Sequence, residues 1–122
     1  MIETLEAYLA ELDEPARTWV AEFTDYVGAA YPSLQLTMFR QRPMFKFGRT
    51  YTDGYVMFTA AKSHFTLHAI EFDLIEAFRL RLPRASFGKG SIKVKFGDVD
   101  AKPVLREFVD QVMARHGVAR AG

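Results

Sequence analysis

The sequence predicts an α+β fold: a mainly antiparallel five-stranded sheet with four helices, the N- and C-terminal ones packed on one face. Hydrophobic residues repeat at helical spacing near both ends of the chain and alternate with a period of two between them. The predicted strands also follow one another through short turns, which is typical of antiparallel neighbours. At 122 residues the chain has the usual size of one domain, so we expect a single domain over residues 1–122.

Two amphipathic helices are predicted at the N-terminus. The first covers residues 2–12, and the second ends at Pro32, whose ring cannot continue a helix. Asp13 is predicted to cap the second helix, with Pro15 in its first turn. The two apolar stripes are Ile2, Leu5, Leu9 and Leu12, then Ala16, Trp19, Val20, Phe23, Val27 and Ala30.

From Leu34 onward the hydrophobic period changes to two, which indicates strands. Asp53-Gly54 is typical of a two-residue type I′ hairpin, because both central residues of that turn need positive φ. Gly88-Lys89-Gly90 predicts a further turn in which glycine supplies the positive φ. The five predicted strands cover residues 34–38, 44–52, 55–60, 64–69 and 91–96.

Two helices flank the last predicted strand. Asp73 and Glu76 have the spacing of a capping box, and Pro83 ends the helix that follows them. Pro103 opens the final helix, and Gly117 suits the C′ position behind it. The apolar stripes are Leu74, Ile75, Phe78 and Leu82, then Leu105, Phe108, Val109 and Val112.

Composition excludes several classes of chemistry. The chain has no cysteine, which rules out disulfides, thiolate nucleophiles and cysteine-based metal sites. The N-terminus lacks the basic and apolar regions of a signal peptide, and no apolar run approaches the roughly 20 residues of a membrane span. We therefore expect a cytoplasmic protein without a membrane partner. Eleven Phe, five Tyr and one Trp exceed the usual need of so small a domain, so they must line a core, a pocket or an interface.

The formal charge of +1 hides an asymmetry. Residues 1–25 hold seven acids against one base, Arg17, which leaves eight acids and fifteen bases for the remainder. Between Phe39 and Tyr51, aromatic and basic residues interleave as they do in single-strand nucleic-acid binders. The acidic helices nearly cancel the charge, however, and the isoelectric point near 8.0 disfavours nucleic acid as a partner.

A candidate binding site lies on one face of the predicted sheet. On a strand, His64, Thr66 and His68 point to one side. Lys93 and Lys95 share a side of the last strand, and Tyr55 and Thr59 share a side of the third. If these sides coincide, the face could hold a small anion or carboxylate through charge-assisted hydrogen bonds. The alternative is the ordinary solvated side of an antiparallel sheet.

No metal or cofactor site is predicted. His64 and His68 have the spacing that chelates a metal on a helix, but on a strand they lie about 13 Å apart, at ~3.3 Å per residue. Iron would then need carboxylates, and exposed acids on a helix usually bind nothing specific. The acids in question are Glu3, Glu6, Glu11, Asp13 and Glu14.

Nor is a catalytic apparatus predicted, so we expect the protein not to be an enzyme. There is no GxSxG elbow, and the serines lack patterned acid and base partners. Asp98 and Asp100 are explained as caps of the final helix. Gly88-Lys89-Gly90 lacks the spacing of a phosphate-binding Walker loop, and a strand rather than a helix follows it.

Several blocks of the chain resemble the YdhG-like domain family. They are Tyr8-Leu9-Ala10-Glu11-Leu12, Pro43-Met44-Phe45, the run from Tyr55 to Phe65 (YVMFTAAKSHF) and Gly88-Lys89-Gly90-Ser91-Ile92-Lys93. The resemblance covers most of the chain in the same order. It implies an α+β fold in a family of largely unknown function, some members of which are labelled frataxin-like intracellular iron chaperones. The chain departs from the family in the polar and basic stretches 40–42 and 48–52.

The positions that match the family's motifs are Lys62, His64, Lys89 and Gly90, and the resemblance assigns them no role. Combined with the sheet face, they predict a ligand site of Lys62, His64, His68, Lys89, Lys93 and Tyr55 in a non-enzymatic binding domain. Two alternatives stay open. In one, the surplus Phe and Tyr form a protein-interaction or homodimer face. In the other, which rests on the resemblance alone, the protein is an iron-binding chaperone.

Overall fold

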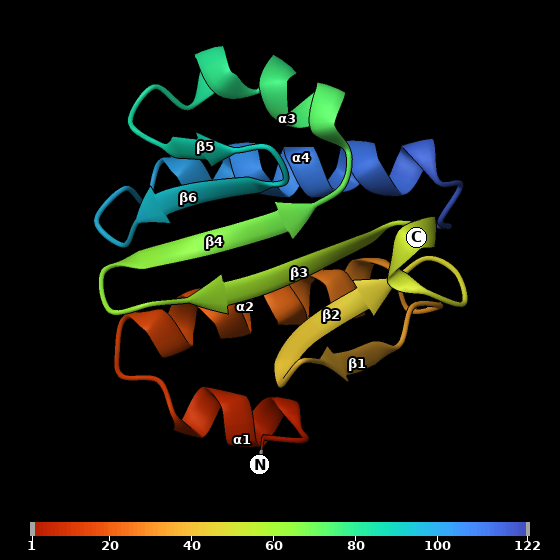
Figure 1. The fold of residues 1–122 in the computed structure, drawn as a ribbon, viewed down its shortest axis with the longest axis horizontal. Helices are drawn as coiled ribbons and strands as arrows, with labels where there is room; N and C mark the ends of the chain where they lie inside the picture. The colour runs from red at the N-terminus through yellow and green to blue at the C-terminus, as the bar shows by residue number, and fades with distance from the viewer. Residues whose placement is uncertain (1, 122) are drawn as a thin grey trace.

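The computed structural model describes residues 2–121 as a sheet with two long helices packed on one face (Figure 1). All neighbouring strands are antiparallel, and their order is β1-β2-β3-β4-β6-β5. The strands are β1 (Leu36–Phe39), β2 (Arg42–Lys46), β3 (Tyr55–Ala60), β4 (His64–Ala69), β5 (Ser86–Gly88) and β6 (Ser91–Lys95). The α+β class predicted from hydrophobic periodicity is confirmed.

The long helices α2 (Ala16–Ala30) and α4 (Ala101–Arg115) lie behind the sheet in Figure 1, and no helix formed by residues 2–121 crosses the face toward the viewer. The short helices α1 (Leu5–Ala10) and α3 (Phe72–Ala77) lie at opposite ends of the molecule, at the bottom and the top of Figure 1. Two 3₁₀ turns, Tyr51–Asp53 and Arg79–Arg81, complete the regular structure. None of the helices in the described part of the chain has the length and apolar character of a membrane span.

The core forms between the sheet and the two long helices. On each central strand every second residue points to the helices, as the period of two requires. The surplus aromatic residues are largely used here, and Trp19, Phe23 and Phe65 contact one another with ring centroids 4.8–6.3 Å apart. The strand residues in this core are Phe45, Val56, Phe58, Phe65, Leu67, Ala69, Ile92 and Val94.

The tight hairpin of the sheet lies at a different place from the predicted one. Arg40 and Gln41 connect β1 to β2 and have φ of +50° and +67°, the two positive values that a type I′ turn needs. The prediction of this turn at Asp53-Gly54 is wrong. The predicted strand 44–52 ends at Lys46, and Asp53 belongs to a 3₁₀ turn in the longer β2–β3 connection. Only Gly54, at φ +113°, keeps a positive angle there.

The sheet has six strands because β5 pairs with β6 at the edge. Three residues are too few for alternation to mark a strand, so the sequence predicted five. The connecting turn contains Lys89 and Gly90, and neither Gly88 nor Gly90 has positive φ, contrary to the prediction. Gly90 is instead required by close approach, since a Cβ there would lie 2.9 Å from the backbone oxygen of Ala69.

The predicted helix caps need correction. The first helix is shorter than 2–12 and is capped by Thr4, whose hydroxyl accepts from the Ala7 amide at 3.1 Å. Asp13 does not cap α2, which begins at Ala16 behind Pro15. Asp73 is not a cap either, because it lies inside α3 and pairs with Arg115 at 2.8 Å. That helix ends at Ala77, ahead of the 3₁₀ turn and Pro83.

The end of α4 follows the prediction. Gly117 occupies the C′ position with φ +68°. The amides of Gly117 and Val118 bond to the carbonyls of Ala114 and Met113 at 3.1 and 2.9 Å, which is the Schellman pattern. The chain then turns back toward α2, and this turn brings residues 118–121 beside that helix.

Candidate functional site

The side of the sheet away from α2 and α4, here called the open face, gathers polar and basic residues. Strand alternation and register place the following residues on it: Thr37, Phe39, Arg42, Met44, Lys46, Tyr55, Met57, Thr59, His64, Thr66, His68, Ser86, Gly88, Ser91, Lys93 and Lys95. Four of these strand positions are Lys or Arg, and none is Asp or Glu. A surface with a single sign of charge attracts the opposite charge.

The centre of the open face is a row of side chains that runs across four strands. Thr59 of β3 pairs with Thr66 of β4, and Thr66 pairs with Lys93 of β6. Arg42 of β2 completes the row, because it lies two residues beyond the Met44–Met57 pair on the side of Thr59. At ~4.8 Å per strand, the row spans about 14 Å between its outer Cα atoms. Two hydroxyls therefore lie between two cations, an arrangement called here the threonine row.

His68 lies in the adjacent row, beside Met57, and reaches back to the threonine row. Its Nε2 lies 2.8 Å from Oγ1 of Thr59. Burial, followed by the positive charges of Arg42 and Lys93, lowers the pKa of His68 from 6.5 to about 4. The imidazole is therefore neutral near pH 7. Arg42 and Lys93, at the two ends of the row, both lower the pKa of this ring, so the charges of both act at the middle of the open face.

The basic side chains and hydroxyls of the threonine row are available to bind an anion. Within residues 2–121, the side chains of Arg42, Lys93 and Lys95 take part in no hydrogen bond or ion pair. Lys46 donates to the carbonyl of Arg49 at 3.3 Å. A neutral His68 that donates to Thr59 would leave the threonine hydroxyl proton free to point at a bound oxygen. The row can thus offer hydroxyl and charged donors to one ligand.

Four of the six predicted site residues lie on the open face: Tyr55, His64, His68 and Lys93. They do not form one tight cluster. Lys93 belongs to the threonine row and His68 lies beside it, whereas Tyr55 and His64 lie towards opposite ends of the face. His64 pairs with Lys95 across the strands, and its Nδ1 lies 2.7 Å from Ser63 Oγ.

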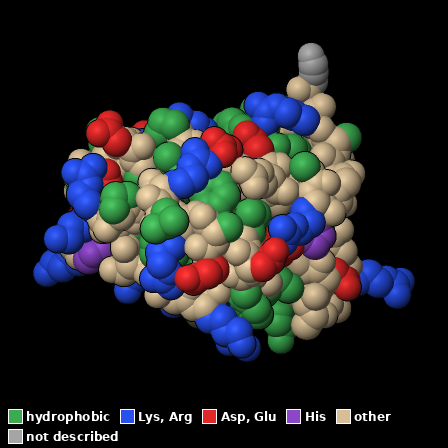
Figure 2. Space-filling view, turned by 90° about the horizontal axis from the view of Figure 1, so that it is seen from above, with side chains coloured by type: hydrophobic (Ala, Val, Ile, Leu, Met, Phe, Trp, Pro, Cys, Tyr) green, Lys and Arg blue, Asp and Glu red, His purple; other side chains and the backbone are tan. Residues whose placement is uncertain are grey.

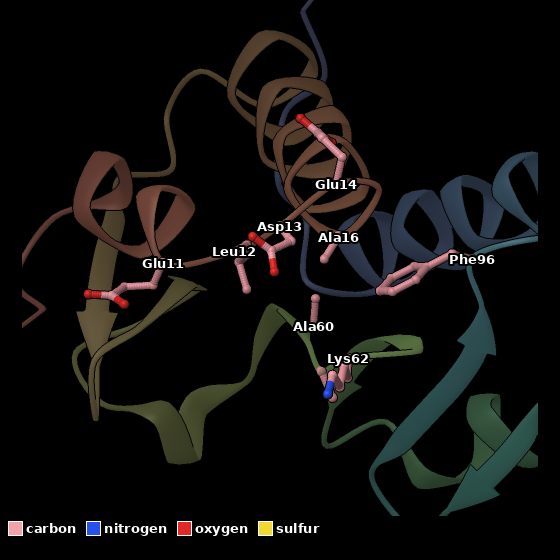
Figure 3. A pocket seen from close by; sticks show the side chains of 9 residues that line it. Glu11, Leu12, Asp13, Glu14, Ala16, Ala60, Lys62 and Phe96 are labelled. Atoms are coloured by element: carbon pink, nitrogen blue, oxygen red, sulfur yellow. The ribbon is translucent and has the colours of Figure 1, made fainter.

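Lys62 and Lys89 lie away from the other predicted site residues. Lys62 is in the β3–β4 turn and lines a cavity of about 420 Å³ at the junction with the α1–α2 connection (Figure 3). Its other polar residues are Glu11, Asp13 and Glu14. Lys89 is in the β5–β6 turn, where its Nζ lies 5.0 Å from the ring centroid of Phe72. Neither lysine belongs to the threonine row.

Arg42 is the residue of this site that sequence reasoning missed. The predicted strand begins at Met44, behind Pro43, so Arg42 falls in the preceding polar stretch. Arg42, Met44 and Lys46 lie on one side of β2, but Met44 is as buried as Pro43 and Phe45, so the segment lacks the polar–apolar alternation that would have marked Arg42 as a strand residue. Pro43 is compatible with β2, because the β2–β3 register begins at Met44 and Pro43 is paired only with Met38 of the edge strand β1.

The surface on the side of α3 carries charges of both signs (Figure 2). Figure 2, which views the molecule from the side of α3, shows Lys and Arg interspersed with Asp and Glu around a few hydrophobic residues. Several of these form ion pairs, such as Arg79 with Glu76 at 3.1 Å. Asp98, predicted as a helix cap, instead pairs with Arg84 at 2.7 Å. Charges on this side therefore largely satisfy one another.

The aromatic and basic segment 39–51 divides between two environments. Phe45 is in the core, and Phe47 stacks on His116 with ring centroids 4.5 Å apart. Phe39 and Tyr51 form a separate pair with ring centroids 5.1 Å apart.

No group of three or more His, Asp or Glu side chains that could hold a metal ion comes together within residues 2–121. His64 and His68 lie on one extended strand, as predicted.

Comparison with known proteins establishes the fold. No model of a known protein family matches the chain, and no curated protein does. A solved structure does match: the crystal structure of YdhG, a protein of the DUF1801 family from Bacillus subtilis, with a TM-score of 0.74 and 17% sequence identity. The match covers 92% of this chain and 90% of the other. The chain thus has the YdhG fold that the sequence resemblance implied.

Proposed function

We propose that this protein is a non-enzymatic binding domain of the YdhG-like type, and that the threonine row on its open face binds an anionic group. The observation that carries the proposal is the placement of Thr59 and Thr66 between Arg42 and Lys93, with no acidic side chain on any strand position of that face. The similar fold of YdhG supports the architecture, and the chemistry rests on this chain's own residues.

The charges of the row support binding of an anion rather than an internal ion pair. Arg42 and Lys93 both lower the pKa of His68, so both lie close enough to act on a ligand placed beside that ring. Neither cation is neutralised by an acid among residues 2–121. A bound anion would relieve the repulsion between them, and it would gain the charge-assisted hydrogen bonds that carboxylates and phosphates make.

The middle of the row supports an oxygen ligand. Thr66 is only 9% exposed, so its hydroxyl sits low on the face with the longer basic side chains around it. Directly opposed residues of two strands have Cβ atoms about 5 Å apart, a spacing that lets two hydroxyls contact one phosphate or carboxylate. Neutral His68 then fixes the orientation of Thr59 without adding charge.

The test is anion binding followed by calorimetry and thermal unfolding. Inorganic phosphate, sulfate and succinate would be titrated against the wild-type protein, with sodium chloride at matched ionic strength as reference. Removal of charged donors costs about 1.5–3 kcal/mol each, so the double variant Arg42→Ala/Lys93→Ala should weaken binding at least tenfold. The matched control is Lys62→Ala/Lys89→Ala, which removes the same charge from outside the row and should bind as the wild type does.

Two results would contradict the proposal. Equal weakening in both double variants would mean that net charge, not the row, controls binding. The absence of a phosphate, sulfate or succinate effect beyond that of chloride, up to millimolar concentration, would mean that the row holds none of these anions. A Thr59→Val/Thr66→Val variant separates hydroxyl donation from charge and should also weaken binding.

Self-association and iron binding stay predictions. The aromatic surplus that suggested a dimer face is largely packed in the core, where Phe58, Phe65 and Phe108 are fully buried. The exposed large hydrophobic residues are scattered: Tyr51, Phe72, Leu80 and Val99. Mass measurement at micromolar concentration tests the first prediction, and calorimetry with ferrous iron tests the second.

A further inference from the structure

A polar cluster joins α2, α4 and the C-terminal segment at the end of the molecule away from the β3–β4 turn. Tyr26 and Tyr31 donate from their hydroxyls to the carboxylate of Asp110, at 2.8 and 2.6 Å. Nη1 of Arg120 donates to both hydroxyls and to Asp110, at 2.9, 3.2 and 2.9 Å respectively. One guanidinium nitrogen is thus surrounded by three oxygen acceptors from two different helices.

The tyrosine rings also contact the cation. The guanidinium carbon of Arg120 lies 5.6 Å from the ring centroid of Tyr26 and 5.6 Å from that of Tyr31. Aromatic faces attract a cation through the ring quadrupole, and a carboxylate supplies the opposite charge. Two aromatic walls with a carboxylate between them are the components that proteins use to recognise a guanidinium or alkylammonium group.

Tyr26, Tyr31 and Asp110, called here the cation cage, are held in place without Arg120. Both hydroxyls bond directly to Asp110, and Tyr31 is only 2% exposed. Tyr26 and Tyr31 come from the C-terminal end of α2, and Asp110 is in the middle of α4. The cage therefore stands on two long helices that pack against the sheet, and it would keep its shape if the guanidinium left. A preformed site of this kind does not need to order itself when a ligand binds.

The segment that carries Arg120 is held more lightly than the cage. The Arg120 side chain is 53% exposed. Beyond the Schellman bonds at Gly117 and Val118, the backbone of residues 119–121 makes one hydrogen bond to the rest of the described chain, from the Ala121 amide to the Ala30 carbonyl at 2.7 Å. Exposed ion pairs and single terminal hydrogen bonds open at low free-energy cost. Release of this segment would uncover the cage.

We propose that the cation cage is a guanidinium-binding site which Arg120 occupies from within the chain, and that the arginine side chain of a partner can take its place. The proposal is independent of the threonine row, since the cage lies on α2 and α4 rather than on the open face of the sheet and binds the opposite charge. It also assigns residues 119–121 a role as an arm that closes the cage. The tyrosine hydroxyls and Asp110 together raise the pKa of Arg120 above its usual value, which agrees with a site suited to a cation.

The first test replaces the arginine by a free analogue. Arg120→Ala should lower the thermal midpoint, and ethylguanidinium at millimolar concentration should restore it along a saturable curve. Ethylammonium, which has the charge without the planar fork, should restore it less. The variant Arg120→Ala/Asp110→Asn lacks the carboxylate and should show no saturable rescue. Arg106→Ala removes an arginine elsewhere on α4, and it should respond to ethylguanidinium no differently from the wild type.

Absence of saturable rescue in Arg120→Ala would overturn the proposal, and so would equal rescue when Asp110 is also replaced. Asp110→Asn could weaken the cage structurally, so Tyr31→Phe in the Arg120→Ala background gives a second check that keeps the carboxylate. It should reduce the apparent affinity for ethylguanidinium at least threefold. An unchanged affinity in that variant would also count against the cage.

The second test asks whether Arg120 can be displaced in the intact protein. N-acetyl-argininamide would be titrated into the wild type while the amide resonance of Ala121 is followed by NMR. Displacement should shift this resonance and speed its hydrogen exchange, because the bond to Ala30 is lost. N-acetyl-glutaminamide is the uncharged control. If N-acetyl-argininamide leaves the Ala121 resonance unchanged at concentrations at which ethylguanidinium rescues Arg120→Ala, exchange with a partner arginine is contradicted. An equal shift with N-acetyl-glutaminamide would contradict it as well.

Discussion

His68 Nε2 lies 2.8 Å from Oγ1 of Thr59 across the β3–β4 pair, on the face of the sheet opposite α2 and α4. The contact is diagonal, since Thr59 is paired with Thr66 and His68 with Met57. It links the row formed by Met44, Met57 and His68 to the threonine row. Because the charges of Arg42 and Lys93 lower the pKa of His68, the pKa of this histidine reports the charge on this face.

Acid stability should depend on His68. Burial first, then Arg42 and Lys93, lowers its pKa from 6.5 to about 4 in the folded state. The unfolded chain therefore binds more protons between these values, and stability should fall as the pH drops from 6.5 to 4. Allowing for screening at a partly exposed ring, the loss is about 1–2 kcal/mol. Urea unfolding of wild type and His68→Gln at several pH values should show a smaller loss of unfolding free energy in the variant as the pH falls from 6.5 to 4. An equal loss in both proteins would contradict this prediction.

The pKa of His68 should rise when either neighbouring cation is removed. Arg42→Ala and Lys93→Ala each remove one repulsive charge, so each should move the pKa from about 4 toward 6.5, without reaching it because burial remains. NMR titration of the His68 ring protons measures the change. Lys62→Ala serves as the control, since Lys62 lies in the turn beyond β3. An equal change of the His68 pKa in all three variants would contradict the conclusion that Arg42 and Lys93 act on this ring more strongly than other cations do.

Alkaline stability should depend on Tyr31. Burial and the hydrogen bond to Asp110 raise its pKa to about 12, above the ordinary value of 10.0. The folded state therefore holds this proton more tightly than the unfolded state does. The resulting stabilisation, about 1 kcal/mol or more, is present below pH 10 and lost as the pH rises through 12. Unfolding of Tyr31→Phe should show a shallower loss over this range than the wild type. Tyr51→Phe, at an exposed tyrosine, should keep the wild-type slope.

Two glycines should respond to alanine substitution in opposite directions. Gly28 lies in α2 with nothing within 4 Å of an added Cβ, so Gly28→Ala should stabilise the protein by about 0.5–1 kcal/mol through helix propensity. Gly54 has φ +113°, and an added Cβ would lie 2.8 Å from the His116 ring and 2.9 Å from the Phe47 ring. Gly54→Ala should destabilise by about 1–3 kcal/mol or more.

Denaturant unfolding of the two glycine variants under identical conditions provides the measurement. Tolerance of Gly54→Ala would mean that the β2–β3 connection can move away from the Phe47–His116 stack. Destabilisation by Gly28→Ala would contradict the presence of open space beside Gly28 on α2.

Elements with strong periodicity were predicted closely. The strands Tyr55–Ala60 and His64–Ala69 have the predicted bounds, because each alternates core and surface residues over six positions. Elements whose ends depend on a few polar residues were less accurate. Arg40-Gln41 adopts the tight turn although neither residue favours positive φ, and Asp53-Gly54 does not, although its local preference is strong. Pairing of β1 with β2 overrides local preference at both places.

The chain's pattern of apolar and polar residues determined the α+β class, the central strands and the side on which His64, His68, Thr59 and Lys93 lie. That information is local, because alternation along a strand assigns each side chain to one face. Tertiary structure alone decided that Arg42 joins Lys93 around the two threonines, that Lys62 and Lys89 lie elsewhere, and that Arg120 meets Tyr26, Tyr31 and Asp110. Such meetings depend on strand order, register and helix packing, which arise from contacts between residues far apart in the chain and leave no periodic trace in it.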